Sequence, residues 1–177
     1  MIDSEGAPPQ PQGPTNFQLA GLVAKDVELD SIVLKRAELE SHATSETEVT
    51  ELAQASQFRP SYELLKGPPR RLAVHMAFVL DLSFPTEPPT NVLHLGAEYA
   101  LTYKLPETTS EYPPEALQWF AELNGTLNVW PYWRELVHTV VARVGLGSIT
   151  LPVWRAQARP IEPRSGQAPT PGASTTS

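Results

Sequence analysis

The sequence contains no cysteine. This absence excludes disulfide bonds, thiolate metal sites and cysteine nucleophiles. It is compatible with a reducing compartment, and we expect the protein to act in the cytoplasm.

Positive charge is also scarce. The chain has 13 basic and 20 acidic residues, a net charge of −7, and its basic residues cluster only in the short pairs Lys35-Arg36 and Arg70-Arg71. A nucleic-acid-binding protein needs a cationic surface that displaces counterions. The charge balance therefore predicts no nucleic-acid partner.

Long hydrophobic runs are missing as well. The first residues, MIDSEGAPPQPQGPTN, have neither the cationic nor the apolar part of a secretory signal. No apolar run approaches the roughly 18 residues that a membrane span requires. We expect no signal peptide and no membrane insertion.

Motifs of catalysis are absent too. The four histidines have no metal-ligand spacing, and there is no GxSxG elbow or glycine-rich phosphate loop. His75 and His94 fall on the wetter side of two predicted strands, and we interpret them as surface histidines. The sequence predicts a non-enzymatic protein with no cofactor and no metal.

Proline divides the chain into one folded unit and two tails. Residues 1–16 and 156–177 combine several prolines with small polar residues. Such composition buries too little surface to offset the entropy of ordering. We predict disordered tails at 1–16 and 156–177 around a single domain, residues 17–155.

Two segments alternate clearly between apolar and polar residues. They span residues 71–84 and 91–105 and are separated by the turn sequence FPTEPPTN. Alternation with period two is typical of a half-buried strand. The pair predicts an antiparallel hairpin with one wet face.

The preceding segments indicate strands less clearly. Residues 27–40 are interpreted as a strand, although their apolar spacing also suits a helix. The polar stretch 41–56 predicts a loop. Residues 58–66 predict a short strand, which Pro60 assigns to an edge or a bulge.

Helices follow the strands. One is predicted from Pro113-Pro114 to a C-terminal cap at Gly125, and a longer one over 128–144 with Asn128 as its cap. An extended apolar segment, 148–154, comes next. Strands followed by helices indicate an α+β fold: a four-stranded antiparallel sheet with the long C-terminal helix packed on one face.

Aromatic residues concentrate between positions 119 and 154. A helix cannot bury every ring of Trp130-Pro131-Tyr132-Trp133 in one direction, so part of this surface is expected to be exposed or covered by another chain. Core packing is the competing interpretation, above all for Trp133. The candidate groove or oligomer-interface residues are Trp130, Tyr132, Trp133, Val137, Ile149, Leu151, Val153 and Trp154.

The stretch from Asn128 to Glu135, followed by Arg143, Gly145 and the segment 149–153, resembles the signature of the SecB chaperone family. The resemblance covers roughly residues 27–154, and its specific part is 128–153. It implies a homotetramer built as a dimer of dimers. It also implies a groove between helix and sheet that holds unfolded clients for export without ATP.

The C-terminal end departs from that family. The acidic tail and the second long helix of typical members are absent, and Arg155, Arg159 and Arg164 stand there instead. This departure puts docking to the SecA motor in doubt. Two alternatives stay open: a dedicated chaperone of an antitoxin in a toxin–antitoxin module, and a small-molecule-binding α+β domain with a titratable group buried in its pocket.

Overall fold

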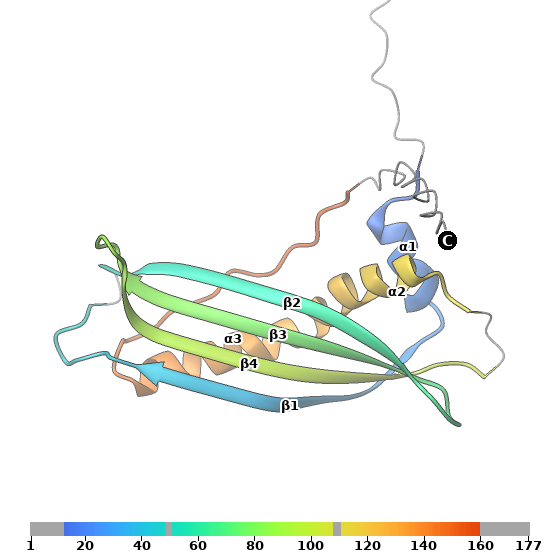
Figure 1. Ribbon diagram of the computed structural model, residues 1–177, viewed down its shortest axis with the longest axis horizontal. Coiled ribbons are helices and arrows are strands. Elements are labelled where there is room, and N and C mark those ends of the chain that lie inside the picture. Colours follow the sequence, from blue (N-terminus) through green and yellow to red (C-terminus); the bar gives the residue numbers. More distant parts are fainter. Residues whose placement is uncertain (1–12, 49–50, 108–110, 160–177) are drawn as a thin grey trace, which may run out of the picture.

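A four-stranded antiparallel sheet with helices on one face forms the protein (Figure 1). The computed structural model describes residues 13–48, 51–107 and 111–159. The strands are β1 (Glu28–Ser41), β2 (Ala53–Leu65), β3 (Arg71–Phe84) and β4 (Thr90–Lys104), in the order β1-β4-β3-β2. The helical elements are α1 (Asn16–Ala24), α2 (Pro114–Phe120), the π-helical turn η2 (Ala121–Gly125) and α3 (Thr126–Arg143). The predicted α+β architecture with its long C-terminal helix is confirmed.

The central hairpin β3–β4 follows the predicted alternation. Phe78 on β3 pairs with Ala97 on β4, and the alternate residues on either side of them point toward the helices. The buried members of this face are Leu72, Val74, Met76, Phe78, Leu80 and Leu82 on β3, and Leu93, Leu95, Ala97, Tyr99, Leu101 and Tyr103 on β4. Their burial forms the floor of the hydrophobic core.

The two outer strands are longer than a periodicity argument suggests. Residues 28–41 form strand β1, so the strand interpretation of 27–40 holds over the helical one. Strand β2 begins at Ala53, inside the stretch 41–56 that was predicted to be a loop. That part of the loop prediction is wrong because backbone pairing with β3 extends the polar end of β2. Pro60 lies within β2 at the sheet edge, as predicted.

Helices α2 and α3 are one continuous rod joined by η2. Gly125 has helical dihedrals, φ −58° and ψ −50°, so the prediction that it caps a helix is wrong. Glycine is required there for another reason: a Cβ at Gly125 would lie 2.9 Å from Val74 Cγ1. Asn128 is not a cap either, because it lies within α3 and donates a hydrogen bond to the Tyr103 hydroxyl at 2.8 Å.

Helix α1 was not predicted. Its signal is a capping box, in which Thr15 Oγ1 accepts from the Gln18 N–H while the Gln18 side chain accepts from the Thr15 N–H. The helix packs against α2. Within the described ranges, no helix is long and apolar enough to cross a membrane.

Most of the two predicted tails lies outside the described residues. Of the segments 1–16 and 156–177, only 13–16 and 156–159 are described. These two short pieces contact each other through Asn16, as set out below.

Candidate functional site

The eight predicted groove or interface residues occupy three environments. Three are buried in the core: Trp133, Val137 and Leu151. Three are partly buried against it: Trp130, Ile149 and Trp154. Two are exposed: Tyr132 at 51% and Val153 at 66%.

Trp133 belongs to an aromatic cluster centred on Phe78. Its ring stacks on Phe78 with centroids 5.3 Å apart and planes at 22°. Phe78 also contacts Phe58, Tyr99 and Trp130, at centroid distances of 6.1, 6.2 and 6.1 Å. Trp133 is therefore a packing residue of this chain. Its buried Nε1 has no hydrogen-bond partner among the described residues.

Trp130 joins the core to the segment that follows α3. One side of its ring packs on Phe78, and its Nε1–H donates to the Pro152 carbonyl at 3.0 Å. The structure thus brings Trp130 together with the apolar segment 148–154. The local sequence does not reveal this bond, which spans 22 positions.

Residues 146–159, here called the strap, return along the helix layer toward α1 (Figure 1). Gly145 and Gly147 adopt φ values of +84° and +82°, which reverse the chain after α3. Leu146 and Leu151 are buried, whereas Val153, which follows them in the strap, is exposed. The strap therefore lies in a groove and is held there by a few side chains.

Asn16 holds the far end of the strap. Its Nδ2 donates to the Gln157 carbonyl at 2.9 Å, and its Oδ1 accepts from the Arg159 N–H at 2.9 Å. Its own N–H donates to the Arg159 carbonyl at 3.1 Å. Asn16 is buried, so these bonds satisfy an amide that would otherwise be costly to bury. Sequence analysis had placed Asn16 in a tail.

Two hollows flank the strap. One, of about 250 Å³, lies between α1, the start of α3 and Trp154, with Phe17 and Leu127 among its lining residues. The other, of about 230 Å³, is lined by Asn16, Phe58 and Glu122 on the groove side and by Arg155 and Arg159 of the strap. The strap fills its groove incompletely.

A second apolar surface lies on β1. Leu29, Leu34 and Leu39, here called the β1 leucine stripe, pair with Tyr103, Tyr99 and Leu95 of β4 and so point to the helix side. They are nevertheless 40%, 45% and 50% exposed. The stripe is uncovered because the helices pack on β2, β3 and β4. Periodicity predicts to which face of the sheet a side chain points, but not whether another element covers it. Sequence analysis therefore did not identify these leucines as candidate site residues.

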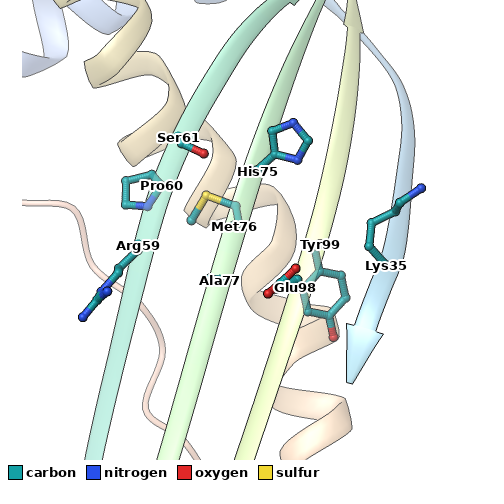
Figure 2. A pocket seen from close by; sticks show the side chains of 9 residues that line it. All are labelled: Lys35, Arg59, Pro60, Ser61, His75, Met76, Ala77, Glu98 and Tyr99. Carbon is teal, nitrogen blue, oxygen red and sulfur yellow. The ribbon is translucent and has the colours of Figure 1, made fainter. Parts of the chain in front are cut away.

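The opposite face of the sheet is polar and carries a shallow hollow of about 450 Å³ (Figure 2). Its lining includes the small residues Ala77 and Ser61 and the charged residues Lys35, Arg59 and Glu98. His75 lines it and is exposed. A small-molecule site would be favoured by a buried Asp, Glu or His, but no Asp, Glu or His of the described ranges is buried.

Charged side chains cross this open face in a connected row. His94 Nδ1 lies 2.7 Å from Asp81 Oδ1, and His94 Nε2 lies 3.6 Å from Glu38 Oε1. Glu38 can lie flat on the sheet because Gly96 beneath it has no side chain. The hydrogen bond to Asp81, aided by the nearby carboxylate charges, raises the pKa of His94 against the opposing effect of burial. The row links β3, β4 and β1 through side chains.

Comparison with known protein families finds no match, and no curated protein matches the chain in sequence. Among solved structures, the chain is similar to the Rv1957 SecB-like chaperone of Mycobacterium tuberculosis, solved in complex with a ChAD peptide from the Rv1956 HigA1 antitoxin. The TM-score is 0.68 at 19% identity, over 78% of this chain and 98% of that one. A protein of unknown function from Streptococcus agalactiae matches with a TM-score of 0.43 at 11% identity, over 72% of this chain and 98% of that one.

The first of these similarities establishes the fold. Its alignment spans nearly the whole of the other chain and more than three quarters of this one. The resemblance that residues 128–153 indicated is confirmed at this level: the chain has the fold of a SecB-like chaperone.

Proposed function

We propose that the protein is an ATP-independent chaperone that holds aggregation-prone polypeptide, and that its main client is the antitoxin of a toxin–antitoxin module. The observation that carries this proposal is the β1 leucine stripe, which is apolar and uncovered in a fold shared with a SecB-like chaperone. A contiguous apolar surface of this kind is typical of an interaction site.

The stripe suits an extended client. It lies on an edge strand, whose free N–H and C=O groups can pair with a polypeptide backbone while the leucines contact apolar side chains. Burying a whole leucine side chain contributes about 1.5–3 kcal/mol, so three half-exposed leucines contribute roughly 3 kcal/mol together. Binding of that strength is readily reversed without ATP.

The antitoxin is favoured by what the structural neighbour binds, a ChAD peptide from the HigA1 antitoxin. The net charge of −7 also favours basic clients and keeps a chaperone with exposed leucines soluble.

We extend the proposal to the predicted groove. Its surface-accessible members, Trp130, Tyr132, Ile149, Val153 and Trp154, form a second contact surface for a client or for another copy of the chain. Trp133, Val137 and Leu151 support this surface from the core.

The proposed assembly is a homotetramer, a dimer of dimers. Part of the β1 leucine stripe is then shared between copies. Light scattering is expected to give a mass of four times 19.4 kDa. A monomer at micromolar concentration would contradict this assembly while leaving client binding to be judged separately.

Two variants of adjacent residues test client binding. Leu34 and Val33 are exposed to similar extents on opposite faces of β1. An aggregation-prone antitoxin is diluted from denaturant with wild-type protein, Leu34→Lys or Val33→Lys, without nucleotide, and its light scattering is followed. We expect wild type and Val33→Lys to suppress aggregation near a stoichiometric ratio and Leu34→Lys to fail.

The range of clients that the protein holds distinguishes a dedicated antitoxin chaperone from a general holdase. The same assay is run with three unrelated denatured enzymes. Suppression of antitoxin aggregation alone supports a dedicated chaperone, and equal suppression of all four supports a general holdase. If wild-type protein suppresses none of them, the chaperone proposal is wrong.

A further inference from the structure

The strap is attached to the molecule differently from the other extended segments. Between residues 147 and 158, its backbone makes no hydrogen bond with another described backbone group. Its contacts are the buried side chain of Leu151, the partly buried side chains of Ile149, Trp154 and Ala156, a Ser148–His138 contact at 3.5 Å, the indole donor Trp130, and the amide clamp of Asn16. A segment held by so few bonds opens at low free-energy cost.

These contacts require little of the segment they hold. Trp130 binds a carbonyl and Asn16 binds backbone N–H and C=O groups, so both act on main-chain atoms that any polypeptide offers. Specific side-chain contacts come from Leu151 and, three positions later, the partly buried Trp154. The groove thus recognises an extended backbone with two apolar side chains three positions apart.

The groove is also wider than the strap. Trp154 and Ala156 line both flanking hollows, of about 250 and 230 Å³, so free space lies on either side of this segment. Glu122 lines the same hollow as Arg155 and Arg159. The groove therefore presents an acidic group to the basic end of its occupant.

We propose that this groove is a binding site for an extended, apolar and basic segment of a partner polypeptide, and that the strap is its internal occupant, which the partner displaces. This inference rests on the proposed chaperone function and adds a recognition rule to it. The partner segment has an apolar residue in the place of Leu151 and an aromatic or large apolar residue in the place of Trp154. A basic residue follows the second one.

Displacement makes a definite prediction about affinity. The apparent dissociation constant of a partner segment equals its intrinsic dissociation constant divided by the fraction of molecules whose groove is open. A substitution that weakens the strap but leaves the groove walls intact must therefore tighten binding. A strap that serves only to stabilise the fold would give no such gain.

The experiment uses a labelled peptide with the strap sequence, SITLPVWRAQAR, and fluorescence anisotropy with the full chain. We expect Leu151→Ala to bind it about tenfold more tightly than wild type. Thr150→Ala, which changes an exposed strap side chain, is the matched control and is expected to bind like wild type. In the Leu151→Ala chain, Trp130→Phe removes a groove donor and is expected to weaken binding again.

Hydrogen exchange of the wild-type chain keeps the inference testable if Leu151→Ala folds poorly. Adding saturating peptide is expected to speed exchange of the Arg159 amide, which donates to Asn16 Oδ1 in the closed strap, as the strap is released. Equal affinity of Leu151→Ala and Thr150→Ala, or unchanged exchange at Arg159, would overturn the inference. If the chain still holds antitoxin in that case, only the strap inference fails; if it holds no client, the proposed function fails first.

Discussion

Leu72 and Leu34 point to the same side of one sheet, yet they lie in different surroundings. Leu72 on β3 lies beneath the helix layer and is fully buried. Leu34 pairs with Tyr99, so it belongs to the same face, but it is 45% exposed. The helix layer covers β2, β3 and β4 and stops short of β1. The apolar face is thus buried on the two central strands, no residue of either edge strand is buried, and the exposed leucines of β1 are the surface proposed for client binding.

The largest expected effect lies in the covered region. Phe78→Ala removes a fully buried ring that contacts four other aromatic rings. We expect a loss of about 3–5 kcal/mol in the free energy of unfolding, because the cavity cannot close completely. Val79→Ala, on the opposite face of the same strand, is expected to cost about 1 kcal/mol or less. Equal losses in urea denaturation would show that the two faces are equally packed.

A smaller effect is expected where the helix rod touches the sheet. The Cβ of Gly125→Ala would clash with Val74 Cγ1, so we expect a loss of about 1–3 kcal/mol from overpacking. Gly21→Ala in α1 meets nothing within 4 Å and is expected to gain about 0.5–1 kcal/mol from helix propensity. Thermal unfolding of the two variants should therefore shift in opposite directions. A shift of Gly125→Ala in the same direction as Gly21→Ala would contradict the close packing.

The uncovered region is expected to behave in the opposite way. Leu34→Ala should change the free energy of unfolding by less than about 0.5 kcal/mol, because the side chain is half exposed, while it lowers the amount of client held. Denaturation and the client assay measured on one sample compare the two effects. A stability loss near that of a core leucine would mean that a second copy covers the stripe.

The smallest effect concerns pH and the open face. The folded chain raises the pKa of His94 above its usual 6.5, chiefly through the hydrogen bond to Asp81. Protonated His94 therefore stabilises the folded state below pH 6.5, and this contribution is lost as the pH rises through the raised value. The groups are partly exposed, so we expect about 0.5 kcal/mol or less. His94→Asn should remove this part of the pH dependence, measured by denaturation between mildly acidic and mildly basic pH.

The sequence predicted the elements that are defined by local patterns. Alternation located β3 and β4 nearly to the residue, because their buried face is continuous. The first half of β2 was not predicted to be a strand. This polar segment is held as a strand by its pairing with β3, and its own residues show no strand pattern. Gly125 was interpreted as a helix end because its helical dihedrals are imposed by contact with Val74, which is distant in sequence.

The candidate site was predicted in part. The aromatic run and the segment 148–154 were assigned to one candidate groove or interface, and the structure joins them through the bond from Trp130 to the Pro152 carbonyl. Full burial of Trp133 and Leu151 could not be separated from partial burial by periodicity alone. The Asn16 clamp joins residues 141 and 143 positions apart, and no local pattern indicates such a contact.

The π-helical turn η2 has a further consequence for the rotational phase of the helix rod. A π turn accommodates one residue more than an α turn, and each residue of an α-helix advances the side chain by about 100°. The extra residue therefore sets the orientation of Phe120, in α2, relative to Val129 and Trp133, in α3, so that all three are buried in one core. Deleting a single residue from 121–125 would restore a regular helix and turn the apolar side of α2 away from α1. The number of residues in this rod therefore determines the rotational orientation of its side chains as well as the length of the rod.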